Sequence, residues 1–167
     1  MDEIKLVRKS KKGNNLAFST LIKAYEKDLY KVAIAMTKNE EDALDCIQEA
    51  ILQSYISIKD LRQEEYFKTW LIKILINKCN DVIRANKNII YIEQEKEEGY
   101  SENIEQSVSL RECFDRLKPD YKIVMIMYYD QGFNSKEISE ILNINENHYQ
   151  YIINIKIKKV NTINNKC

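Results

Sequence analysis

Apolar positions recur along most of this chain at steps of three and four residues, the period of an amphipathic α-helix. The clearest case is the segment 66–87, whose apolar positions are Phe67, Trp70, Leu71, Ile74, Leu75, Cys79 and Val82. The segment 16–37 repeats the period through Leu16, Leu21, Tyr25, Leu29, Val32 and Met36. Further helices are predicted over 2–12 and 40–58, the second with Ala43, Ile47, Ala50, Ile51 and Ser54 facing inward. Four helices ending near residue 88 predict one all-α module.

Polar breaks separate these helices. Gly13-Asn-Asn15 interrupts the first pair, and the polar stretch Lys59–Glu65 predicts a loop before the fourth helix. Asn39 is a predicted N-cap, because acidic residues follow it in the first turn, where the helix dipole favours them.

The character of the chain changes over residues 89–104, where the charges are mostly acidic and Gly99-Tyr-Ser is a helix breaker. This stretch predicts a flexible linker between a first domain, 1–88, and a second domain, 105–167. The short apolar run Ile89-Ile-Tyr-Ile92 leaves a transient docking strand as an alternative, and a bare linker is the favoured interpretation.

Residues 105–167 predict a helix-turn-helix. One helix is expected over 108–117, and Pro119 suits the first turn of the next, over 120–129, which Gln131-Gly132 ends. Asn134 or Ser135 would cap a short helix that ends near Leu142, and the turn 143–145 leads into a last helix over 146–162. A short helix, a three-residue turn and a longer helix are typical of DNA-binding modules, although any helical hairpin can imitate them.

Composition supports helices and gives no global charge signal. With Gly 3 and Pro 1 in 167 residues, the chain is poorly suited to many strands and hairpins. The formal net charge is zero, so no overall basic excess points to nucleic acid. Mildly basic ends nevertheless flank the acidic middle, which suits two modules that face nucleic acid and a solvated connector.

Candidate chemistry is sparse. The four cysteines include no C-x-x-C pair and the chain has one histidine, so neither a metal site nor a cofactor is predicted. No nucleophile or histidine accompanies the carboxylates of the 40–58 helix, so no enzymatic active site is expected. The absence of a signal peptide and of an apolar run near 18 residues predicts a soluble, cytoplasmic protein.

Three motifs in this order resemble the extracytoplasmic-function sigma factors of bacteria, group 4 of the sigma-70 family. The first is Glu41-Asp-Ala-Leu-Asp-Cys-Ile-Gln-Glu-Ala50. The second joins Phe67-Lys-Thr-Trp-Leu71 to Asn77-x-x-x-Asp81-x-x-Arg84. The third runs from Leu117-Lys-Pro-Asp120 to Gly132-Phe133 and carries one residue inserted before the proline. The resemblance covers nearly the whole chain and implies a sigma region 2-like domain and a region 4-like domain.

The resemblance implies how such a chain would bind core RNA polymerase. In the family, the helix similar to 42–55 docks on the coiled coil of the polymerase β′ clamp, and the second module meets the β flap. The implied contact residues are Asp42, Asp45, Gln48 and Glu49. The alternative for this acidic face is an ordinary solvated helix surface.

The resemblance also implies a promoter-melting surface for the −10 element, in which the loop over 59–66 would hold a flipped base. The implied residues are Lys59, Asp60, Arg62, Lys73, Asn77, Asn80 and Arg84. Phe67 and Trp70 are expected in the core, and Asp81 is expected to orient neighbouring cations.

The recognition helix departs most from the family pattern. Positions that are basic in the family are Gln150, Ile152, Ile155 and Ile157 here, so guanine reading by arginine is lost. The implied −35 contacts are Lys136, His148, Gln150, Tyr151, Asn154, Lys156 and Lys158, which suit an A/T-rich element read largely by shape. Alternatively, Tyr149, Ile152, Ile153 and Ile155 would widen a buried face that packs on the first module or on an inhibitor.

Together these implications predict an alternative sigma factor that binds core RNA polymerase and promoter DNA and is monomeric when free. Most members of the family are held inactive by an anti-sigma factor, often membrane-bound, that wedges between the two modules. Two alternatives remain at this point. One is a dimeric helix-turn-helix regulator that acts without polymerase, and the other is a degenerate sigma-like interaction protein.

Overall fold

The structure is a computed structural model that describes residues 2–90 and 119–145, and every regular element in those ranges is helical. The α-helices are α1 (Glu3–Lys11), α2 (Asn15–Thr37), α3 (Glu40–Ser57), α4 (Phe67–Ile90), α6 (Pro119–Met125) and α7 (Ser135–Leu142). Two 3-10 turns, Ile58–Asp60 and Glu64–Tyr66, connect α3 to α4, and a π-helical turn, Ile126–Asp130, continues α6. The predicted all-α fold is confirmed.

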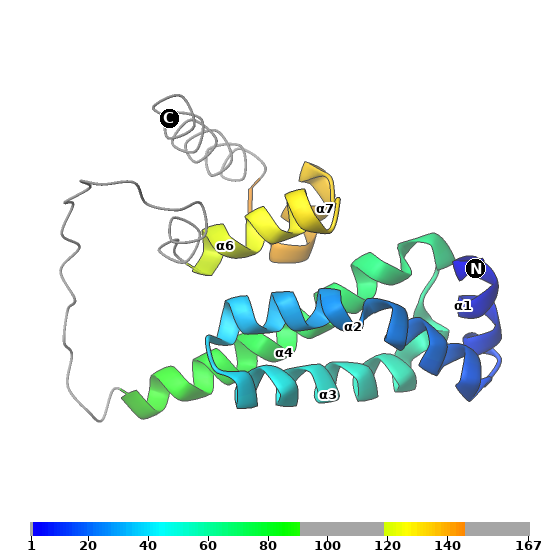
Figure 1. Cartoon of the computed structure of the whole chain (residues 1–167), viewed down its shortest axis with the longest axis horizontal. Helices are drawn as coiled ribbons and strands as arrows, with labels where there is room; N and C mark the ends of the chain where they lie inside the picture. Colours follow the sequence, from blue (N-terminus) through cyan, green and yellow to red (C-terminus); the bar gives the residue numbers. More distant parts are fainter. Residues whose placement is uncertain (1, 91–118, 146–167) are drawn as a thin grey trace.

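Helices α1–α4 form the first module. Figure 1 shows α2, α3 and α4 running side by side along the long axis, with the short α1 lying across one end. The predicted helix bounds hold to within one or two residues, except that α4 continues to Ile90. Residues 89 and 90 therefore belong to a helix, where the sequence predicted the start of the linker. The rest of that linker and the predicted helices over 108–117 and 146–162 lie outside the described residues.

Side-chain caps begin the helices of this module. Asp2, Asn14 and Asn39 have extended backbones, and each side chain accepts a hydrogen bond from the backbone N–H three residues later. These bonds satisfy helix N–H groups that have no partner within the helix. The predicted role of Asn39 is confirmed.

The core of the first module follows the predicted period with two departures. Leu29, Phe67, Leu71, Leu75 and Cys79 are fully buried, as the pattern requires. Leu16 was expected inside, but 79% of its surface is exposed because it lies in the first turn of α2, beyond the reach of the neighbouring helices. Ile72 and Ile76 are buried although the predicted apolar face of α4 did not include them.

The second module packs on the first. Helix α6 lies against α2, and α7 lies against α4, on the side of the bundle away from α3 (Figure 1). The buried residues of the second module continue the hydrophobic core of the first, and they are Ile123, Val124, Met127, Phe133, Ile138 and Ile141. Within the described residues, the two modules therefore share one core.

Pro119 begins α6 as predicted, but the end of this helix differs from the prediction. The helix was expected to stay α-helical to residue 129, and instead the Gln131 N–H bonds to the carbonyl of Ile126, 3.1 Å away, which makes a π-helical turn. Gly132 then takes a φ of 73°, which glycine adopts without steric cost, and Phe133 N–H donates to the Met127 carbonyl. The predicted stop at Gln131-Gly132 is confirmed.

A capping box begins α7. The Asn134 side chain accepts from the Glu137 N–H, and the Glu137 carboxylate accepts from the Asn134 N–H. Between the two caps that the sequence left open, the structure selects Asn134. Asn143 ends the helix in the left-handed conformation and opens the expected turn.

Candidate functional site

The acidic face predicted on α3 is on the surface. Asp45, Gln48 and Glu49 are exposed, and Asp42 is half-buried and accepts a hydrogen bond of 3.2 Å from Asn86 of α4. Glu49 also reaches α4, where Lys78 lies 3.6 Å away. The helix α4 therefore orients two of the four predicted contact residues, while the face itself stays open to a partner.

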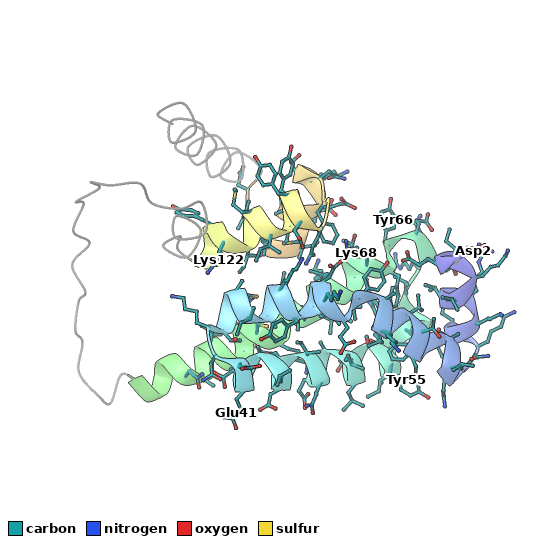
Figure 2. The ribbon with its side chains drawn as sticks, viewed as in Figure 1. Asp2, Glu41, Tyr55, Tyr66, Lys68 and Lys122 are labelled. Carbon is teal, nitrogen blue, oxygen red and sulfur yellow. The ribbon has the colours of Figure 1, made fainter. Side chains whose placement is uncertain are left out.

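Sequence reasoning missed the apolar part of this face. Leu44, Gln48, Leu52 and Ile56 succeed one another at four-residue steps, and Leu52 and Ile56 are 55% and 66% exposed. Tyr55 is exposed beside them, and its hydroxyl donates to the Asn15 side chain of α2. Apolar residues interleaved with acids at helical spacing were the available signal, since a merely solvated face has no need of them. Figure 2 places Glu41 and Tyr55 on this side of the bundle, opposite α6 and α7.

The loop between α3 and α4 is held in place by α1. The Lys11 ammonium donates to the Leu61 carbonyl at 2.7 Å and pairs with Glu64 at 3.1 Å, and Arg8 lies 3.6 Å from Glu64. The ammonium of Lys11 lowers the pKa of the Glu64 carboxyl below its ordinary value. Leu61 is buried and anchors the middle of the loop.

This anchored loop presents side chains to solvent. Lys59, Asp60 and Arg62 are all exposed, as a nucleic-acid contact requires. Tyr66 is half exposed at the end of the loop, where Figure 2 shows it beside the first turn of α4. An exposed aromatic ring is the kind of side chain on which unpaired bases stack in proteins that bind single-stranded nucleic acid.

The remaining predicted −10 residues form one stripe along α4. Lys73, Asn77, Asn80 and Arg84 follow one another at steps of four, three and four residues, and all but the half-buried Asn80 are exposed. Asp81 lies 3.8 Å from Arg84, and its orienting role stays a prediction. The core face of α4 lies elsewhere on the helix, since the rings of Tyr25 and Trp70 both contact Phe67.

Lys136 of the predicted −35 set is exposed on α7. The other members, from His148 to Lys158, lie outside the described residues. Whether the last predicted helix contacts DNA or packs on the first module therefore stays a prediction.

Within residues 2–90 and 119–145, no group of three histidine, cysteine or acidic side chains is arranged to hold a metal ion. No helix in those ranges is both long and apolar enough to cross a membrane.

Comparison with known proteins assigns the family. Residues 21–89 match Sigma-70 region 2, and residues 107–151 match Sigma-70, region 4. RNA polymerase sigma factor SigV of Bacillus subtilis is 32% identical over 142 residues, covering 83% of this chain and 86% of the relative. The ECF RNA polymerase sigma factor SigW of the same organism is 29% identical over 158 residues, covering 84% of each.

Two solved structures share the fold. The sigma factor RpoE of Bartonella quintana, in complex with the anti-sigma factor NepR, superimposes with a TM-score of 0.69 at 14% identity, covering 87% of this chain and 95% of that one. CnrH in complex with the cytosolic domain of CnrY gives a TM-score of 0.68 at 17% identity, covering 98% and 97%.

The fold, the two matched regions and these relatives define a bacterial transcription initiation factor. The chain belongs to the extracytoplasmic-function sigma factors of the sigma-70 family. It is an alternative sigma factor that directs transcription from promoters, and not an enzyme. None of the comparisons favours the dimeric regulator.

Proposed function

We propose that this sigma factor binds its two main partners, core RNA polymerase and promoter DNA, through two different faces of one helical bundle. The acidic and apolar face of α3 binds core RNA polymerase, and the polar stripe of α4 with the loop over 59–66 reads and opens the −10 element. The arrangement of α4 carries the proposal, because its exposed stripe is separate from the face that builds the core. Promoter contact through this stripe therefore needs no rearrangement of the bundle.

The α3 face is suited to a basic, partly apolar partner. Asp45 and Glu49 provide charge that steers association, while Leu44 and Leu52 provide apolar area that stabilises the bound state. Charge contributes mainly to association rate and register, and buried apolar side chains contribute most of the affinity.

The −35 element is assigned to the second module, 105–167, and the first domain, predicted as 1–88, is extended to Ile90, where α4 ends. Lys136 on the exposed side of α7 suits a phosphate contact, and His148, Gln150, Tyr151, Asn154, Lys156 and Lys158 would supply the rest. A cognate anti-sigma factor, a class often bound to the membrane in this family, is a further partner in this proposal. The free protein is a monomer. Of the two similar solved structures, RpoE is in complex with the anti-sigma factor NepR, and CnrH is in complex with the cytosolic domain of CnrY.

Run-off transcription with core polymerase on the DNA upstream of the protein's own gene tests the proposal. A discrete start site is expected from the wild-type protein.

Lys73→Ala and Arg84→Ala should each weaken promoter binding by the holoenzyme. Each should also lower the slope of log affinity against log salt concentration by about one unit, since each removes a phosphate contact. Lys23→Ala, on the exposed surface of α2, is the matched control and should leave the promoter affinity and its salt slope unchanged. Equal effects of all three substitutions would show that α4 is not part of the −10 interface.

A further inference from the structure

Helix α1 lies outside the part of the chain that matches a sigma region. The match to Sigma-70 region 2 begins at residue 21, and α1 ends at Lys11. In Figure 1 this helix lies across the end of the bundle where α3 connects to α4, and it contacts both 3-10 turns of that connection. A helix without an assigned role therefore touches the loop that we assign to the −10 element.

The loop depends on anchoring side chains for its shape, because its middle lies outside regular helical structure. Leu61 and Gln63, on either side of Arg62, have extended backbones between the two 3-10 turns. Three buried side chains hold the connection, which are Ile58 at its start, Leu61 in its middle and Phe67 at its end. The exposed side chains lie between these anchors, so the anchors determine where the exposed side chains stand.

The Lys11 ammonium joins the two halves of this loop. It donates to the Leu61 carbonyl at 2.7 Å, before the bend at Arg62, and it pairs with Glu64 at 3.1 Å, after the bend. The Lys11 and Glu64 side chains are 23% and 21% exposed, so solvent screens this pair less than a pair on the open surface. Removal of the ammonium would take a donor from a carbonyl and a carboxylate at once, and the loop would have to move to solvate them.

The helix that carries Lys11 is itself fixed to the bundle. Val7 is fully buried in the core. The Glu3 carboxylate faces the hydroxyl of Tyr25 on α2, and burial together with this carboxylate raises the pKa of Tyr25 above its ordinary value. The Tyr25 ring lies 5.9 Å from the ring of Phe67, the first residue of α4, measured between ring centres. The position of the Lys11 ammonium is therefore set by the same core that positions α2 and α4.

We propose that Lys11 is a positioning residue for promoter recognition, which holds the loop over 59–66 in the shape that selects a base of the −10 element and does not itself contact DNA. This inference rests on the proposed function, in which that loop reads the element. The Lys11 ammonium is engaged by two protein groups, whereas Lys59, Asp60 and Arg62 are exposed for contact with DNA. The base preference at −10 thus depends on a helix that precedes the matched region.

Hydrogen exchange in the free, full-length protein tests whether Lys11 holds the loop. Lys11→Met removes the ammonium and keeps an unbranched apolar side chain, and it should speed exchange over residues 58–67 by about fivefold, because the loop opens more often. Lys9→Met, at an exposed site on the same helix, is the matched control and should leave this exchange unchanged. Unchanged exchange in Lys11→Met would overturn the positioning role, whether or not the protein proves to bind polymerase.

Run-off transcription from promoters with single-base changes tests the effect on recognition. Each base of the −10 element is substituted in turn, and the activity is divided by the activity on the unchanged promoter. A general loss of folded protein cancels from this ratio, and so does a phosphate contact that all the promoters share. The ratio therefore reports base selection and not stability or overall affinity.

The wild-type holoenzyme should lose most activity when the base held by the loop is changed. In Lys11→Met this loss should shrink by about fivefold at that base, because a misplaced loop discriminates less, while the ratios at the other bases stay as in wild type. Lys11→Arg keeps a cation with hydrogen-bond donors and should restore the wild-type ratios. Lys9→Met should match the wild type throughout, and equal ratios in Lys11→Met and Lys9→Met would refute the inference.

Arg62→Ala separates failure of this inference from failure of the proposed function. Arg62 is exposed within the loop, so its loss should change the ratio at the same base directly. If Arg62→Ala changes this ratio and Lys11→Met does not, the loop reads the −10 element and Lys11 does not position it. If neither substitution changes any ratio, the loop is not the reader, and the −10 part of the proposed function fails together with this inference.

Discussion

Short polar side chains define where the helices of this protein begin. Asp2, Asn14, Asn39 and Asn134 each stand one residue before a helix and accept a backbone hydrogen bond three residues on. The interaction is local, so the sequence alone predicted Asn39 correctly. For α7 it left Asn134 and Ser135 open, and the capping box with Glu137 decides for Asn134, because only that residue has both reciprocal bonds.

Removal of this cap should loosen α7 specifically. Asn134→Ala deletes the acceptor for the Glu137 N–H, at a cost of about 1 kcal/mol in helix stability. Hydrogen exchange measured by mass spectrometry should show roughly fivefold faster exchange over residues 135–142, as that energy implies for local opening. Glu140→Ala, an exposed site on the same helix, is the control. Unchanged exchange in Asn134→Ala would mean that packing on α4 holds the helix without its cap.

Cys46 and Cys79 meet in the core between α3 and α4. Both side chains are buried, and burial raises the pKa of each thiol above its ordinary value, with the Cys46 thiol adding to the effect at Cys79. Their sequence positions predicted small hydrophobes, and the raised pKa values agree with unreactive structural thiols.

These thiols give stability a pH dependence in the alkaline range. The folded state holds the protons more tightly than the unfolded chain, so their contribution is complete below the unfolded pKa near 9 and is lost as pH rises above it. The free energy of unfolding from urea titrations should therefore fall between pH 8 and pH 10. Substitution of both residues by alanine should flatten this dependence, whereas an unchanged slope would assign it to other groups.

At the scale of single helices, the outward face of α3 shows how periodicity can mislead. Its inward positions were predicted correctly, with Ala43, Ala50 and Ser54 buried. The exposed Leu44, Leu52 and Ile56 were left unassigned. Helical periodicity identifies the buried face only, and it gives no role to apolar residues outside that face. Their place among the predicted contact residues makes them part of the polymerase-binding face that we propose.

Leu52→Lys tests that role. Leu52 is largely exposed in the free protein, so the substitution should leave the free energy of unfolding within about 0.5 kcal/mol of wild type. Affinity for core polymerase, measured by titration of the labelled protein, should fall at least about tenfold, since a central apolar contact is lost and a charge is buried. Gln53→Lys places the same charge one position along α3 and should weaken binding much less. Equal losses would indicate a general charge effect.

Helix α4 carries three distinct faces. Phe67, Leu71 and Leu75 build the core of the bundle, Lys73, Asn77 and Arg84 form the exposed polar stripe, and Ile72 and Ile76 form a further buried stripe. Helical periodicity predicted the core face, and the resemblance to sigma factors implied the residues of the polar stripe. The third face was missed because Ile72 and Ile76 extend an already apolar surface, and one helix seen alone gives no reason for a second partner.

At the scale of the whole molecule, burial of Ile72 distinguishes a closed protein from two separate modules. Ile72→Ala should lower the free energy of unfolding by about 2–4 kcal/mol if the side chain is enclosed, because a buried cavity remains. Lys73→Ala, its exposed neighbour, should change it by less than about 0.5 kcal/mol. Urea unfolding of the full-length protein measures both. A cost below about 1 kcal/mol for Ile72→Ala would show that this stripe is open to solvent.

The sequence by itself determined the helices of the first module, the cap at Asn39 and the family, because each depends on residues close together in the chain or on motifs of fixed spacing. The docking of the second module on α2 and α4 was decided only by the tertiary structure. The pairs Lys31–Asp130 and Lys68–Gln131 join residues from different modules, and no periodic pattern relates their positions. A charged side chain must be either solvated or paired with another group. Only the folded structure determines which group lies close enough to pair with it.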